Sequence, residues 1–168
     1  MSNLNLYKEF YFREIDRKND LNNAINIPIL VITVIISIHF YLFNEVLNPN
    51  VLDFGKVLGS INFITIIVSM LFLIKSYSNF YIMHTYRELS DMGNYHQYEE
   101  SLNSELGDAK LAQMEFESHL VAEFSECAKH NFNVNKKRTE DLAKSKKFLF
   151  FAVFLTIILS IIYIISIF

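Results

Sequence analysis

Hydrophobic residues along this chain gather into three long blocks that hold no acidic residue, lysine or arginine. The blocks cover residues 25–43, 57–74 and 148–168. Each is close to the roughly 20 apolar residues that an α-helix needs to cross a bilayer. Pro28 lies near the start of the first block, where a missing backbone N–H costs little, so it marks a helix entry. The pattern predicts an all-α integral membrane protein with three transmembrane helices.

Lysine and arginine residues indicate which ends of the blocks face the cytoplasm. Four precede the first block, ten lie between the second and third blocks, and the connection between the first two holds only Lys56. Because basic residues favour the cytoplasmic side, we expect a cytoplasmic N-terminus and a C-terminus outside. The predicted domains are a cytosolic N-terminal helix (1–24), a transmembrane helical hairpin (25–77), a cytosolic helical region (78–147) and a C-terminal transmembrane helix (148–168).

The mild net charge of −3 hides an uneven distribution of charge between the second and third blocks. Residues 78–128 hold two basic residues against ten acidic ones, and residues 129–147 hold seven against two. A basic cluster beside a membrane attracts anionic lipid by ~1 kcal/mol per residue near the surface. The same cluster also serves as a topology signal, which is the simpler interpretation. The candidate lipid-headgroup contacts are Lys136, Lys137, Arg138, Lys144, Lys146 and Lys147.

The acidic part contains a strongly amphipathic helical pattern. At about 100° per residue, the apolar side chains from Leu102 to Ala128 fall within an arc of about 160°. Lys110, Gln113 and Glu117 fall within the same arc. Buried polar side chains need partners. These three residues therefore mark an interface between subunits, a hydrogen-bonded contact within the chain, or partial exposure.

The opposite face of that helix carries carboxylates and imidazoles, among them Glu115, His119 and Glu123. Such groups one turn apart can bind a metal or exchange protons, but a solvated acidic face is the more common outcome. One cysteine and four glycines exclude a cysteine-rich zinc site and disfavour a phosphate loop. We therefore expect no enzyme activity, no catalytic residue, no metal and no cofactor. The net acidity gives no reason to expect direct binding of nucleic acid.

Polar residues recur on one face of the second block. Asn62, Thr65 and Ser69 are candidate pore-lining residues, with Phe63 and Phe72 as candidate apolar constrictions. Three spans cannot enclose a pore alone, so conduction would require a ring of several copies. Packing among the three helices of one chain explains the same stripe without a pore.

Two further features of the blocks bear on their packing and function. Gly55 and Gly59 form a G-x-x-x-G motif, which allows helices to approach closely, and we expect helix packing there. No acidic residue, lysine or arginine lies inside a block. That absence argues against a proton pump, a voltage sensor or an ion-coupled transporter built around a buried charge.

Three features occur together in this chain: the entry YKEFYFREIDRKNDLNNAINIPI, a tight hairpin of two spans, and a cytosolic amphipathic helix. This layout resembles small helical membrane effectors of bacterial antiphage defence. Two families look similar, namely the nucleotide-associated two-span-plus-helix effectors called SLATT and the membrane accessory proteins of RNA-targeting type VI CRISPR systems. The third span is additional to the two-span pattern.

The resemblance implies a homo-oligomeric protein of the bacterial inner membrane. Such a protein forms a pore that permeabilises or depolarises the membrane when a cytosolic defence partner senses infection. The alternative hypothesis is a non-conducting membrane anchor or adaptor that recruits a cytosolic partner through its helical region. In either case membrane lipid is an expected partner.

Overall fold

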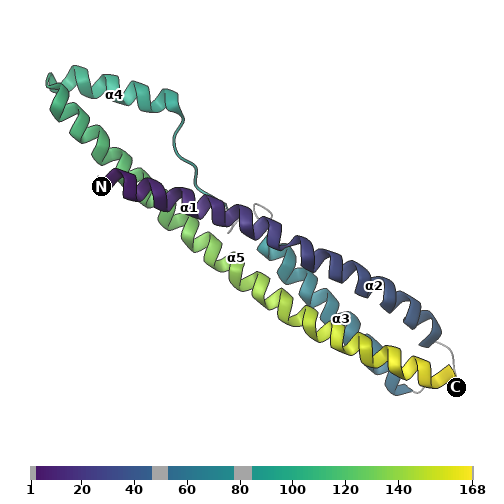
Figure 1. The fold of residues 1–168 in the computed structure, drawn as a ribbon. Coiled ribbons are helices and arrows are strands. Elements are labelled where there is room, and N and C mark those ends of the chain that lie inside the picture. The colour runs from purple at the N-terminus through teal and green to yellow at the C-terminus, as the bar shows by residue number, and fades with distance from the viewer. Residues whose placement is uncertain (1–2, 47–52, 78–84, 168) are drawn as a thin grey trace. The chain divides into compact units, whose positions relative to one another are not determined.

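The computed structural model describes residues 3–46, 53–77 and 85–167, and all regular secondary structure in them is helical. This confirms the all-α class. The helices are α1 (Asn3–Ala24), α2 (Asn26–Val46), α3 (Asp53–Ser76), α4 (Met92–Leu106) and α5 (Ala109–Ile167) (Figure 1).

Three helical stretches are long and apolar enough to cross a membrane. They are the stretch from Asn3 to Leu42, the stretch from Phe54 to Ser76, and the stretch within α5 that ends at Ile165. They contain the second block expected from the sequence and nearly all of the first and third, which were predicted to run to residues 43 and 168. The third block is the C-terminal part of α5, which continues without interruption from Ala109.

A single residue, Ile25, separates α1 from α2. Pro28 falls in the first turn of α2, where backbone N–H groups have no partner inside the helix, so the missing donor costs little. The Ile29 N–H donates to the Ile25 carbonyl at 3.2 Å and keeps the two helices nearly continuous. The placement of Pro28 at a helix entry agrees with the expectation from the sequence.

The prediction of one amphipathic helix from Leu102 to Ala128 was wrong, because the chain turns between Leu106 and Ala109. Gly107 ends α4 in the left-handed conformation, with φ of 61°. Asp108 then starts α5, since its Oδ1 accepts the backbone N–H of Lys110 at 2.8 Å. Glycine favours the first role and aspartate the second. The apolar arc plotted from Leu102 to Ala128 therefore combined the faces of two separate helices.

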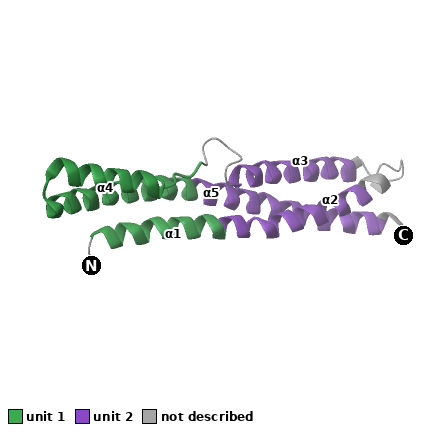
Figure 2. Cartoon of the chain, turned by 90° about the horizontal axis from the view of Figure 1, so that it is seen from above, with its two compact units in different colours: residues 1–20, 82–136 green, residues 21–81, 137–168 purple. Residues whose placement is uncertain are grey.

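The chain divides into two compact units, which Figure 2 colours separately. Unit 1 contains residues 1–20 and 82–136, and unit 2 contains residues 21–81 and 137–168. The core of unit 1 joins α1 to α5, where the Tyr11 ring meets Phe124 edge to face at 5.7 Å between centroids. The other buried members of that core are Cys127 and Ala128.

The core of unit 2 is formed by α2, α3 and the C-terminal part of α5, with Leu21 added from the end of α1. Ile32 and Ile35 come from α2, Ile66 from α3, and Leu149 and Ala152 from α5. All five side chains are almost fully buried. The large apolar residues on the other faces of these helices are exposed, as expected of helices that face lipid.

Buried positions along these helices alternate by three and four residues, which is the seven-residue repeat of left-handed helix bundles. On α3 they run from Gly55 to Ser76, and on α5 from Phe124 to Leu159. Several of the positions are polar. On α5 the buried series is Phe124, Ala128, Asn131, Asn135, Arg138, Leu142, Ser145, Leu149, Ala152, Thr156 and Leu159.

Candidate functional site

The polar stripe of α3 faces α5 inside unit 2. Asn62 donates from Nδ2 to the Thr156 hydroxyl at 2.9 Å. Two turns further along α3, Ser69 exchanges hydrogen bonds with Ser145, each hydroxyl donating to the other residue's carbonyl at 2.9 Å. All four side chains are buried. Because each serine reaches the opposite backbone, the two helices approach closely there.

These contacts account for most of the candidate pore-lining residues. Asn62 and Ser69 are 0% exposed. Thr65 is also buried and donates to the Ile61 carbonyl of its own helix at 2.8 Å. Within one chain the stripe is therefore used for packing. The Asn62 Oδ1 accepts no hydrogen bond from any residue that the structure describes.

The two candidate constriction residues lie on different faces of α3. Phe63 is exposed and stacks on the His39 ring of α2, with 5.6 Å between centroids. Phe72 stacks on Phe148 of α5 at 5.7 Å. The structure brings neither ring to the buried stripe.

At Gly59 the glycine motif makes no close contact with another described helix. A Cβ built on Gly59 would meet no described atom within 4 Å. Gly55 lies one turn before Gly59 on α3, and both residues are buried. Any close packing at Gly59 must therefore involve atoms outside the described part of this chain.

Arg138 occupies the core of unit 2 and is 0% exposed, although the sequence suggested a headgroup contact. Its Nε donates to the carbonyl of Ser76 at 2.7 Å, and its Nη2 donates to Asn22 Oδ1 at 2.7 Å. Ser76 is the last residue of α3, whose final carbonyls lack partners inside the helix. Arg138 therefore caps α3 and ties it to α1 and α5.

The other basic candidates remain at the surface. Lys136, Lys137, Lys146 and Lys147 are exposed, which a headgroup contact requires. Lys144 is exposed too, and its ammonium lies 5.5 Å from the centroid of an aromatic ring of α3.

A second buried polar contact, in unit 1, was missed by the sequence reasoning. Asn135 of α5 donates to Glu14 of α1, at 2.8 Å to the backbone carbonyl and 3.0 Å to Oε2. The Tyr86 hydroxyl donates to Asn135 Oδ1. Glu14 is only 4% exposed. The signal that could have found these residues is the repeat of three and four, in which polar residues take core positions.

The carboxylate and imidazole face of α5 holds the segment that precedes α4. Glu123 accepts the backbone N–H and the hydroxyl of Ser90, at 2.9 and 2.8 Å, and the Tyr95 hydroxyl at 2.8 Å. Nearby, Arg87 pairs with Glu126 and His130 Nε2 lies 2.9 Å from the Thr85 carbonyl. This face therefore fastens residues 85–91, while Glu126 and His119 on it remain exposed to solvent.

The electrostatics of Glu123 follow from those contacts. Burial raises its pKa, but the donors from Ser90 and Tyr95 outweigh burial, and the net pKa lies below its usual value. Burial and the adjacent carboxylate raise the pKa of Tyr95. Ser90 and His119 both contact Glu123, which accepts from the serine hydroxyl and lies 3.8 Å from His119 Nε2. In the described ranges no group of three metal-ligating side chains converges.

The candidate interface residues of the first turns of α5 are not brought against another helix. Lys110, Gln113 and Glu117 are all exposed. Gln113 donates from Nε2 to Glu117 Oε1 at 3.2 Å, within the same face. Leu111 and Met114 beside them are 54% and 62% exposed. This mixed surface is unpaired within the described part of unit 1.

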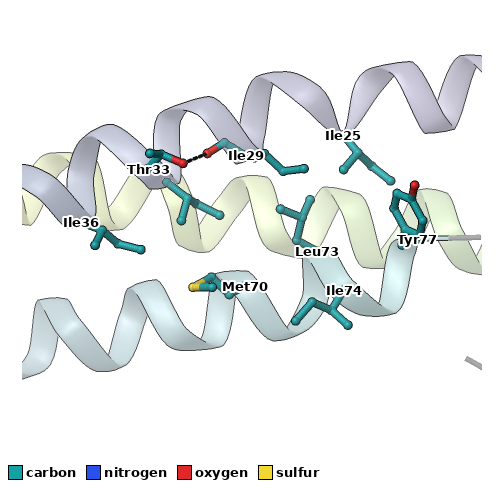
Figure 3. Close-up of a pocket in the computed structure, with 9 residues that line it drawn as sticks. Ile25, Ile29, Thr33, Ile36, Met70, Leu73, Ile74 and Tyr77 are labelled. Atoms are coloured by element: carbon teal, nitrogen blue, oxygen red, sulfur yellow. Dashed lines mark hydrogen bonds between the residues drawn. The ribbon is translucent and has the colours of Figure 1, made fainter. Parts of the chain in front are cut away.

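Apolar grooves lie on the surface of unit 2, two of them along the first half of α2. The first lies between α2 and α3 and has a volume of about 290 Å³, with Ile25, Ile36, Met70 and Tyr77 among its lining residues (Figure 3). Thr33 also lines it, and its hydroxyl donates to the carbonyl of its own helix four residues earlier. The second groove, of about 330 Å³, lies between the start of α2 and α5.

Comparisons of the chain with protein-family models, with curated proteins and with solved structures find no match.

Proposed function

We propose that this protein is a multi-pass inner-membrane anchor or adaptor, with three spans, a cytoplasmic N-terminus and a C-terminus outside. Its helical unit 1 recruits a cytosolic partner, and unit 2 holds that complex at the bilayer. The observation that carries the proposal is the use of the α3 polar stripe for contacts with α5, through Asn62 and Ser69.

These contacts support a non-conducting role because a lumen needs polar groups that are available to water or ions. Turning Asn62 and Ser69 toward a lumen would break the hydrogen bonds to Thr156 and Ser145. In a lipid environment the groups left behind would have no water to replace the lost partners. A closely packed bundle with apolar outer faces is therefore the expected resting state.

The surface proposed for the partner includes the start of α5. Leu111 and Met114 are exposed apolar side chains, and Lys110, Gln113 and Glu117 surround them with polar groups. An apolar centre with a polar rim is the usual composition of a protein interface. A second copy of the chain is the other occupant that this composition fits.

Permeability separates an anchor from a pore. Full-length protein in dye-loaded liposomes should leave them sealed, and cells that express it should keep their membrane potential in a potential-sensitive dye assay. Leakage from the wild-type protein would overturn the anchor proposal.

Crosslinking tests the partner surface. A photocrosslinker at Met114 should give a discrete adduct, whereas one at Met92 should give none. An adduct of twice the chain mass would identify a second copy of the chain as the partner instead.

A pore-forming oligomer of antiphage defence is the second candidate. The observation that favours it is the pair of exposed hydroxyl residues Thr33 and Ser37 on α2, which adds to the resemblance to defence effectors. Both hydroxyls donate to carbonyls of their own helix, which lipid also tolerates. If liposomes leak, S37L should reduce leakage if α2 lines the lumen, whereas N62L should reduce it if α3 does.

A further inference from the structure

The second groove of unit 2 combines an apolar wall with one cation. Its lining comes from Ala24 at the end of α1, from the start of α2 and from one face of α5. Apart from one lysine, the side chains are hydrocarbon, and the lysine is Lys146. Ile27 and Pro28 of α2 face Leu149, Phe150 and Val153 of α5 across the groove.

The position of Lys146 along the groove is set by helix geometry. Leu149, Phe150 and Val153 follow it on the same face of α5, at spacings of three, four and seven residues. Seven residues of helix advance by about 10 Å. Lys146 therefore lies at one end of the groove, and the apolar wall of the groove runs along α5 from there.

Both walls of the groove begin where the sequence places the membrane boundary. Ile27 and Pro28 open the first apolar block, and Lys146 lies just before the third block begins at Phe148. Lys146 is exposed, and none of the ion pairs formed among the described residues involves it. A cation at this depth can reach lipid phosphate while the wall beyond it faces the acyl region.

We propose that this groove is a binding site for one anionic phospholipid, with the phosphate on Lys146 and an acyl chain along Leu149, Phe150 and Val153. The proposal rests on the proposed membrane insertion of unit 2. It distinguishes Lys146 from Lys147, which is also exposed but lies about 100° away around α5 and is not among the residues that line the groove.

The chain contains no tryptophan, so a single introduced tryptophan can report on its own surroundings by fluorescence. F150W places a single fluorophore in the groove, at a side chain that is 77% exposed. F154W places one on α5 outside the groove, at a side chain that is 53% exposed. The full-length variants are reconstituted in phosphatidylcholine bilayers that contain brominated phosphatidylglycerol or brominated phosphatidylcholine. Quenching then reports which lipid lies beside each fluorophore.

We expect brominated phosphatidylglycerol to bind beside F150W about fivefold more strongly than brominated phosphatidylcholine, the preference that one basic residue provides. F154W should show no preference. Combined with F150W, K146Q should remove the preference, K146R should keep it, and the matched control K147Q should leave it unchanged.

Every other outcome overturns either the site or the membrane insertion on which it rests. Equal quenching by the two lipids at F150W would overturn the site but leave membrane insertion intact. Loss of the preference in K147Q as well as K146Q would show general attraction to the basic cluster and would also overturn the site. Quenching at F154W but not at F150W would show that a second copy covers the groove. No quenching at either position would overturn the proposed membrane insertion itself.

Discussion

Polar side chains at core positions decide how the helices of unit 2 pair. Asn62 and Ser69 each have one partner on α5, and Arg138 reaches the end of α3. Contacts between apolar side chains tolerate a shift of one repeat, whereas a displaced polar group loses its hydrogen bond. Buried polar residues in helix bundles select register for this reason. We infer that these residues fix the antiparallel register of α3 and α5.

Removing the Arg138 guanidinium tests this inference at one residue. R138M keeps an unbranched side chain but leaves the Ser76 carbonyl and the Asn22 amide oxygen without their donor. Because at least these two hydrogen bonds from a charged group are lost, the free energy of unfolding should fall by about 3 kcal/mol. Unfolding of the full-length protein by SDS in mixed micelles, followed by circular dichroism, measures the change.

The adjacent residue provides the control for that measurement. Lys137 is exposed, so K137M should change the free energy of unfolding by less than about 0.5 kcal/mol. Equal losses in the two variants would mean that removal of positive charge, rather than loss of the cap on α3, destabilises the protein.

At the scale of the element, two glycines with no described neighbour near a built Cβ have opposite roles. Gly107 has φ of 61° and ends α4, whereas Gly59 lies inside α3. Space does not limit substitution at either position within the described chain. The effect of an added methyl group therefore depends on backbone conformation alone.

Alanine at these two positions should change stability in opposite directions. G107A forces a left-handed conformation on alanine and should lower the free energy of unfolding by about 1 kcal/mol. G59A improves helix propensity and should raise it by up to about 1 kcal/mol. The same unfolding assay measures both. A loss of stability in G59A that depends on protein concentration would instead place Gly59 in a contact between copies.

The elements were predictable from the sequence to the extent that apolar residues marked them. The three uncharged blocks and the entry at Pro28 follow from composition and spacing. The turn at Gly107 and Asp108 was missed because the apolar arc continues across it. Arg138 was assigned to the surface because its charge lies in a basic cluster, and only the three-and-four repeat places it at a core position.

At the scale of the whole molecule, the distribution of charge predicts the orientation of the chain in the membrane. Basic residues are concentrated before the first span and between the second and third. Moving either group to the outside would oppose the positive-inside rule. The proposed partner surface on unit 1 and the Lys146 groove both acquire a cytoplasmic location only if this orientation holds.

Single cysteines labelled with a membrane-impermeant maleimide test the orientation. Cys127 is the only cysteine and is buried, so C127A provides the background. N3C should react in inside-out vesicles and not in intact spheroplasts, since Asn3 is exposed and precedes four basic residues. I165C, at the other end of the chain, should show the opposite pattern. Labelling of N3C in spheroplasts would reverse the topology and place unit 1 outside, where no cytosolic partner could reach it.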